Sequence, residues 1–132
     1  MQAMTAESEL TPLPPAELHV QVQPGLAPAL DLVLLRATFE AINQAEACVL
    51  RAKIEEGDDD GPYLNLMFKT ADLTKLWQVV QRELYDHPTL GQQLRRSSMS
   101  LCTGETGWDD YLLLHHFNPA FELDALGDPD AV

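Results

Sequence analysis

Four short stretches of the chain alternate apolar and polar residues with the two-residue period of a half-buried strand. The clearest alternation begins at Cys48, and the next begins after a loop rich in Asp and Gly. Two alternating runs around such a loop predict an antiparallel hairpin. A fifth stretch is apolar on both of its faces. The predicted strands cover residues 18–23, 48–55, 63–69, 98–102 and 110–117.

Two longer segments carry apolar residues at spacings of three and four, which predicts helices. Residues 28–46 are apolar over a wide arc, so we expect this helix to pack against a sheet or a second chain. The second helix begins near Thr70, a suitable N-cap, and ends before His87-Pro88. A further short helical turn is expected over residues 89–96.

The order of these elements predicts an α+β two-layer sandwich, in which two helices cover one face of an antiparallel sheet. The first six elements follow the ferredoxin-like βαββαβ order, and one extra strand is added at the C-terminal end. No motif specific to a family accompanies this order. We expect a flexible Pro-rich N-terminus over 1–16, a single domain over 17–118 and an acidic C-terminal tail over 119–132.

The charge of the chain narrows the classes of partner. Its 132 residues include 8 Lys and Arg against 21 Asp and Glu, a formal net charge of −13. All the bases lie in residues 36–96, so both ends of the chain are purely acidic. This charge repels phosphate backbones and anionic lipids, so we expect binding neither to nucleic acid nor to a membrane surface.

The cysteines and the start of the chain suggest a reducing compartment. Cys48 and Cys102 lie in apolar segments, and neither has a CxxC partner. We therefore expect buried thiols rather than a disulfide. The first residues lack the basic and apolar regions of a secretory signal, which favours the cytoplasm. No Gly-rich phosphate-binding loop is present, and no cofactor is expected.

Residues 107–117 contain the most unusual cluster of side chains in the sequence, because Trp108, two aspartates and two histidines lie close together. Adjacent histidines in a strand point to opposite faces, so His115 and His116 are not expected to bind one metal ion. A general acid–base pair would combine Asp109 or Asp110 with His115 or His116, yet no nucleophile elbow or Gly-rich phosphate loop supports catalysis. We expect no catalytic or metal-binding residues.

The acidic segment 55–60 resembles a calcium-binding loop in composition only. It lacks the alternating ligands and the distal Glu of an EF-hand, so a solvated hairpin tip is expected. Its carboxylates create a negative potential that steers basic partners.

The sheet face away from the helices is expected to be unusually apolar, because the last strand brings apolar side chains to it whichever way it turns. Such a face is covered by a partner, by a second copy of the chain, or by the chain's own termini. We favour a non-enzymatic module that binds a basic protein, such as an immunity or inhibitor protein against a cationic toxin, or a small chaperone. The predicted partner-binding residues are Asp58, Asp59, Asp60, Tyr63, Met67, Glu105, Trp108, Asp109, Asp110 and Tyr111.

Two alternatives remain open. One is a ferredoxin-like small-molecule-binding or enzymatic domain with a pocket near Trp108, Asp110 and His116. The other is a structural homodimer in which the apolar face is buried against a second copy.

Overall fold

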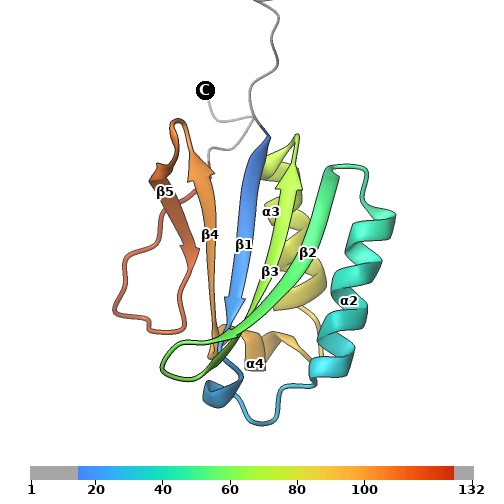
Figure 1. Ribbon diagram of the computed structural model, residues 1–132, viewed down its shortest axis with the longest axis vertical. Coiled ribbons are helices and arrows are strands. Elements are labelled where there is room, and N and C mark those ends of the chain that lie inside the picture. The colour runs from blue at the N-terminus through green and yellow to red at the C-terminus, as the bar shows by residue number, and fades with distance from the viewer. Residues whose placement is uncertain (1–14, 127–132) are drawn as a thin grey trace, which may run out of the picture.

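One antiparallel sheet of five strands is the centre of the structure, a computed structural model that describes residues 15–126 (Figure 1). The strands are β1 (Ala16–Val22), β2 (Val49–Asp58), β3 (Pro62–Thr70), β4 (Ser98–Gly104) and β5 (Gly107–His115). The helices are α2 (Leu32–Ala45), α3 (Leu73–Val80) and α4 (Gly91–Arg95), with a 3-10 turn, η1 (Pro24–Leu26), and a π-helical turn, η2 (Gln81–Tyr85).

The strand order is β2-β3-β1-β4-β5, with β1 in the centre. The connection through α2 joins β1 to β2, and β3 lies between them. The connection through α3 joins β3 to β4, and β1 lies between those two. The expected α+β sandwich is confirmed, and the order agrees with a split βαβ arrangement carrying an extra edge strand.

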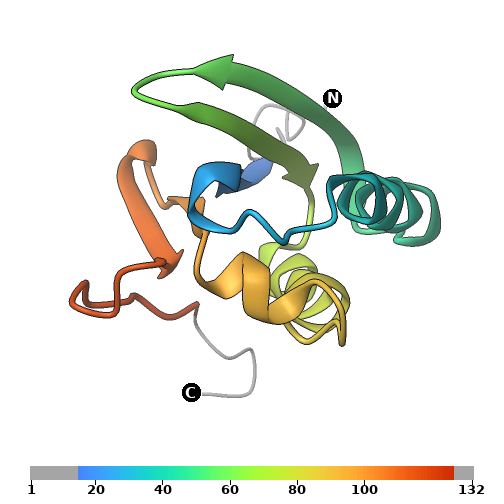
Figure 2. The same ribbon diagram turned by 90° about the horizontal axis from the view of Figure 1, so that it is seen from below.

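The helices cover one face of the sheet, as Figure 2 shows in a view along the strands. Alternate residues of the central strands point to this layer and are buried, because successive side chains of a strand alternate between its faces. Phe68 of β3 meets Phe39 of α2 with ring centroids 5.0 Å apart. The buried apolar residues of β1 and β3 are Leu18, Val20, Val22, Leu64, Leu66 and Phe68.

Aspartates cap the two longer helices. The Asp31 carboxylate accepts a hydrogen bond from Leu34 N at 3.0 Å, so α2 begins four residues later than the apolar pattern predicts. Asp72, rather than Thr70, caps α3 by accepting from Lys75 N at 3.1 Å. The Thr70 hydroxyl instead donates to the carbonyl of Cys48 and ties the start of β2 to the end of β3.

A bulge at the start of β2 changes which residues face the helices. The register with β3 shifts between Val49 and Arg51, so Leu50 is the extra residue and is 57% exposed. The alternation in the sequence predicts that Leu50 faces the helices and Val49 faces away. That prediction is wrong, because Val49 packs against the core.

A buried polar cluster lies where η2 meets β4, and the sequence pattern gave no sign of it. The Tyr85 hydroxyl is 2.7 Å from both Ser98 Oγ and Ser100 Oγ. Burial raises the pKa of Tyr85 to about 12. Because the hydroxyls satisfy one another, serines take core positions of β4 without leaving unpaired polar groups.

The residues after β5 run along the outer edge of that strand. Asp124 makes two hydrogen bonds with the backbone of Leu113. Its amide donates to the Leu113 carbonyl at 2.8 Å, and its carboxylate accepts from Leu113 N at 2.9 Å. Farther on, Leu126 packs against the core. The apolar last strand is therefore an edge strand whose edge is partly covered by the chain itself.

Candidate functional site on the open face of the sheet

The sheet face opposite the helices, which we call the open face, is defined by the strand register. One row of aligned residues holds Arg51, Lys69 and Glu17, and the next holds Lys53, Met67, His19, Leu101 and Leu113. A third row holds Glu55, Asn65, Gln21 and Met99. Figures 1 and 2 show no helix of residues 15–126 on this face.

Charge and apolar surface are separated across the open face. Its basic side chains lie on β2 and β3, whereas β4 and β5 contribute Met99, Leu101 and Leu113. The described part of the C-terminal segment lies along β5 and does not cover this surface. The N-terminal residues 1–14, part of the termini that the sequence offers as one cover for this face, lie outside the described residues.

Trp108 lies over the open face at its β5 end. Its ring centroid is 4.7 Å from that of His19, and it remains 39% exposed. His19 Nε2 lies 3.2 Å from a carboxylate oxygen of Glu17. The Glu17 carboxylate thus contacts the His19 imidazole, and the imidazole packs against the indole of Trp108 and orients it. Glu17 and His19 lie two apart on a strand, so alternation in the sequence places them on one face.

A hollow of about 730 Å³ lies between the β4–β5 hairpin and the start of β1. Its lining is largely apolar, and Glu17 and Glu105 are the acidic residues that line it. Trp108 lines one side, and Leu73, Leu112 and Leu126 line others. A pocket of this size with few convergent polar groups is typical of a recognition site.

Three predicted residues of the β4–β5 hairpin differ in role. The Asp110 carboxylate accepts from both the amide and the hydroxyl of Thr106, at 2.9 and 2.8 Å. These bonds lower the pKa of Asp110. Asp110 therefore fixes the hairpin turn. Tyr111, by contrast, is 53% exposed, and Asp109 is also exposed, so both are accessible to a partner.

The two acidic hairpin tips lie at opposite ends of the sheet. The β2–β3 tip follows the C-terminal end of β1, because Val22 pairs with Leu64, whereas Gly104 lies beyond the N-terminal end of β1 (Figure 1). At the β2–β3 tip the Asp58 carboxylate accepts from Gly61 N at 3.3 Å. The sequence predicts one partner-binding site that contains the carboxylates of both hairpin tips. The structure does not bring the two tips together; their predicted acidic residues are Asp58, Asp59, Asp60, Glu105, Asp109 and Asp110.

Tyr63 and Met67 both lie on the open face, as predicted from their alternation. Tyr63 has a structural role as well, because its ring lies against Gly57 on the neighbouring strand and leaves no room for a side chain there. Met67 lies between the basic and apolar parts of the face.

The histidines of β5 have separate partners. His115 packs on Tyr85 with ring centroids 4.7 Å apart, and its Nε2 lies 2.9 Å from the Arg95 carbonyl. His116 stacks on Phe121 at 4.0 Å. Neither His116 nor Asp110 lines the hollow beside Trp108. Within residues 15–126, no group of three or more His, Cys, Asp or Glu side chains is arranged to hold a metal ion.

Both cysteines are free thiols. Burial raises the pKa of Cys48, and it raises the pKa of Cys102 to about 11. A thiol with a raised pKa is mostly protonated at neutral pH and is therefore a poor nucleophile.

Comparisons with known proteins found no matching family model, no matching curated protein and no matching solved structure. No helix within the described residues is long and apolar enough to cross a membrane.

Proposed function

We propose that this protein is a non-enzymatic binding module that docks a basic polypeptide against the hollow beside Trp108, at the β4–β5 end of the sheet. The observation that carries the proposal is the apolar hollow beside Trp108, which contains the carboxylates of Glu17 and Glu105. An apolar site with carboxylates suits the side chain of lysine or arginine, whose long stem is apolar and whose end is cationic.

Exposed aromatic residues of the β4–β5 hairpin supply anchors. Trp108 and Tyr111 offer large rigid surfaces, and residues of these types dominate the binding energy of many interfaces. A cation of the partner placed over the indole gains a further cation–π attraction. The indole is already positioned by His19, so little side-chain freedom is lost on binding.

The distant acidic tip acts through its field rather than by contact. The β2–β3 tip is separated from Glu105 by the length of the sheet, and a strand rises about 3.3 Å per residue. Asp58, Asp59 and Asp60 therefore raise the association rate of a basic partner and add little to the bound contact. An immunity or inhibitor protein against a cationic toxin has this profile, and so does a small chaperone.

Binding of a synthetic peptide of alternating lysine and leucine tests the chemistry of the hollow. We expect Trp108→Ala to weaken binding by at least about tenfold in fluorescence anisotropy at low salt. Phe121→Ala is the matched control, because Phe121 is also a half-exposed aromatic residue but lies away from the hollow. Equal losses from the two variants would contradict the proposal.

Charge at the hollow is tested in the same assay. Glu105→Gln should weaken peptide binding, whereas Glu40→Gln on the exposed side of α2 should leave it unchanged. Wild-type binding should fall steeply between low salt and about 0.5 M salt, because exposed charges are screened over a few Å there. Binding that ignores salt would overturn the electrostatic part of the proposal.

The molecular mass in solution separates a foreign partner from a second copy. A monomer leaves the open face free for a partner. A dimer that dissociates on Trp108→Ala would instead assign this face to self-association.

A further inference from the structure

We propose that the β2–β3 side of the open face binds a small organic anion, between Arg51 and Lys69. This site meets the hollow beside Trp108 at Glu17, which lines both, and the inference does not depend on the docking of a basic polypeptide. It goes beyond the sequence pattern, which drew attention only to carboxylates and aromatic residues.

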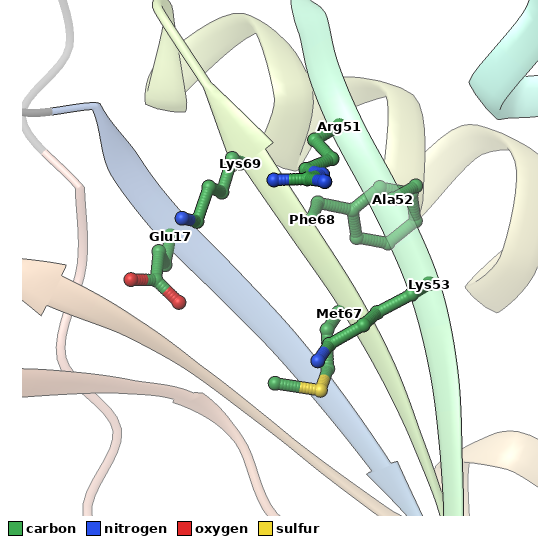
Figure 3. A pocket seen from close by; sticks show the side chains of 7 residues that line it. All are labelled: Glu17, Arg51, Ala52, Lys53, Met67, Phe68 and Lys69. Atoms are coloured by element: carbon green, nitrogen blue, oxygen red, sulfur yellow. The ribbon is translucent and has the colours of Figure 1, made fainter.

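The register of the hairpin brings two positive charges together. Arg51 and Lys69 are direct partners across β2 and β3, and Lys53 lies one row along on the same face. Like charges directly opposite each other destabilise a pair of strands. Figure 3 shows the three basic side chains extending over the open face, with Glu17 on the neighbouring strand.

The carboxylates nearby are engaged elsewhere. Glu17 is opposite Lys69 on β1, yet its carboxylate contacts His19 at 3.2 Å. Glu55 pairs with Lys53 at 2.9 Å. Among residues 15–126, neither Arg51 nor Lys69 has a carboxylate oxygen within 4.0 Å.

The facing position of Arg51 and Lys69 sets them apart from the other bases. Arg36, Arg82 and Arg95 each pair with an acidic side chain within 3.5 Å. Lys75 and Arg96 have no such pair among residues 15–126, yet both lie outside the sheet and face no second base across a strand pair. In a chain with 21 acidic residues, a neutralising partner is easily supplied. Two facing bases without one form a local positive site on a protein whose net charge is strongly negative, and an anion relieves their repulsion.

The surroundings indicate the class of anion. The three bases line a cavity of about 510 Å³ together with Glu17, Met67, Ala52 and Phe68. A guanidinium binds a carboxylate or phosphate through two parallel hydrogen bonds, and the ammonium of Lys69 adds a point charge. Met67 supplies an apolar wall, so the fitting ligand has an anionic group and an apolar or weakly polar body. Glu17 at the β1 side disfavours a second anionic group there.

Calorimetric titration of the full-length protein with benzoate, phenyl phosphate and inorganic phosphate tests the site. We expect saturable binding of at least one of the two aromatic probes at low salt, and weaker binding of inorganic phosphate, which cannot use the apolar wall. If benzoate binds more tightly than phenyl phosphate, the ligand class is a carboxylate; if phenyl phosphate binds more tightly, it is a phosphate ester.

Single neutralising variants locate the binding. Arg51→Gln and Lys69→Gln should each weaken binding of the better probe by about tenfold, the loss expected for one charged hydrogen bond. Lys75→Gln makes the same charge change on α3 and should alter the affinity by less than about twofold, because only a long-range screened effect remains.

Three outcomes would overturn the inference. The first is the absence of saturable binding for all three probes. The second is an equal loss from Lys75→Gln and Lys69→Gln, which would indicate a general charge effect. The third is a loss on Trp108→Ala as large as that on Arg51→Gln, which would move the anion to the other hollow. The first two results do not bear on binding of the basic peptide, whereas the third would also contradict a cation site in the hollow beside Trp108.

Discussion

The two hairpins of this sheet differ in how they are held and in what they expose. The β2–β3 hairpin is anchored by β3, whose Leu64, Leu66 and Phe68 are buried under the helices. The β4–β5 hairpin is anchored by β4, whose buried residues are Ser98, Ser100, Cys102 and Thr103. The buried strand is therefore apolar in the first hairpin and largely polar in the second, and the edge strand β5 is tied down further by the contact of Asp124 with Leu113.

This difference matches the chemistry that each hairpin presents. The apolar packing of β3 offsets an unfavourable arrangement on its other face, where Lys69 and Arg51 are opposite each other. The β4–β5 hairpin instead presents exposed aromatic side chains, those of Trp108 and Tyr111. The molecule therefore has a basic site on one hairpin and an aromatic site on the other.

Removing the core anchor of the first hairpin should have the largest effect. Phe68 is buried and packs on Phe39, so Phe68→Ala should lower the free energy of unfolding by about 3–5 kcal/mol. Leu50→Ala on the exposed bulge should change it by no more than about 0.5 kcal/mol. Urea denaturation measures both values. A small loss at Phe68 would show that the β2–β3 hairpin does not depend on the core.

Breaking the edge contact of the second hairpin should cost less and act locally. Asp124→Ala removes the acceptor for Leu113 N, and we expect a loss of about 0.5–1.5 kcal/mol, because the bond is exposed and water can replace the carboxylate. Amide hydrogen exchange should accelerate at Leu113 and its neighbours on β5 while β3 stays protected. Uniform acceleration across the sheet would show that the two hairpins open as one unit.

Acidification should also act on the second hairpin and not on the first. Burial lowers the pKa of His115 below its ordinary value of 6.5. The unfolded chain therefore takes up a proton at a higher pH than the folded chain does, so stability falls as the pH drops below about 6.5. His115→Asn should reduce this loss, as measured by the melting temperature between pH 7.5 and 5.5. An unchanged pH dependence would mean that His115 titrates alike in both states.

The smallest expected change has the opposite sign. Arg51→Glu places a carboxylate opposite Lys69 and should raise the free energy of unfolding by about 0.2–1 kcal/mol. The same change should abolish binding of the anionic probes, so stability and binding would move in opposite directions. A loss of stability would show that the two bases do not repel each other in the folded protein.

Local patterns in the sequence were sufficient for the type and order of the main elements. The alternation predicts the faces of β1, of β3 and of β2 from Arg51 onward, and the Asp- and Gly-rich loop predicts the hairpin, because strand period and turn chemistry are properties of neighbouring residues. The placement of Trp108 near the functional surface is also a sequence prediction, although the residues that orient it are not.

The positions of the two acidic tips and of the two facing bases were decided only by the tertiary structure. The strand order sends the carboxylates at 58–60 and 105–110 to opposite ends of the sheet, and strand order depends on contacts between residues far apart in the chain. The bulge at Leu50 shifts the register that sets Arg51 opposite Lys69, since core packing chooses Val49 over Leu50. Asp124 reaches Leu113 only because β5 ends the sheet and leaves a backbone amide to be satisfied. The sequence by itself determines the net charge and the periodicity of the strands, whereas the distances between charged side chains depend on the packing of the whole chain.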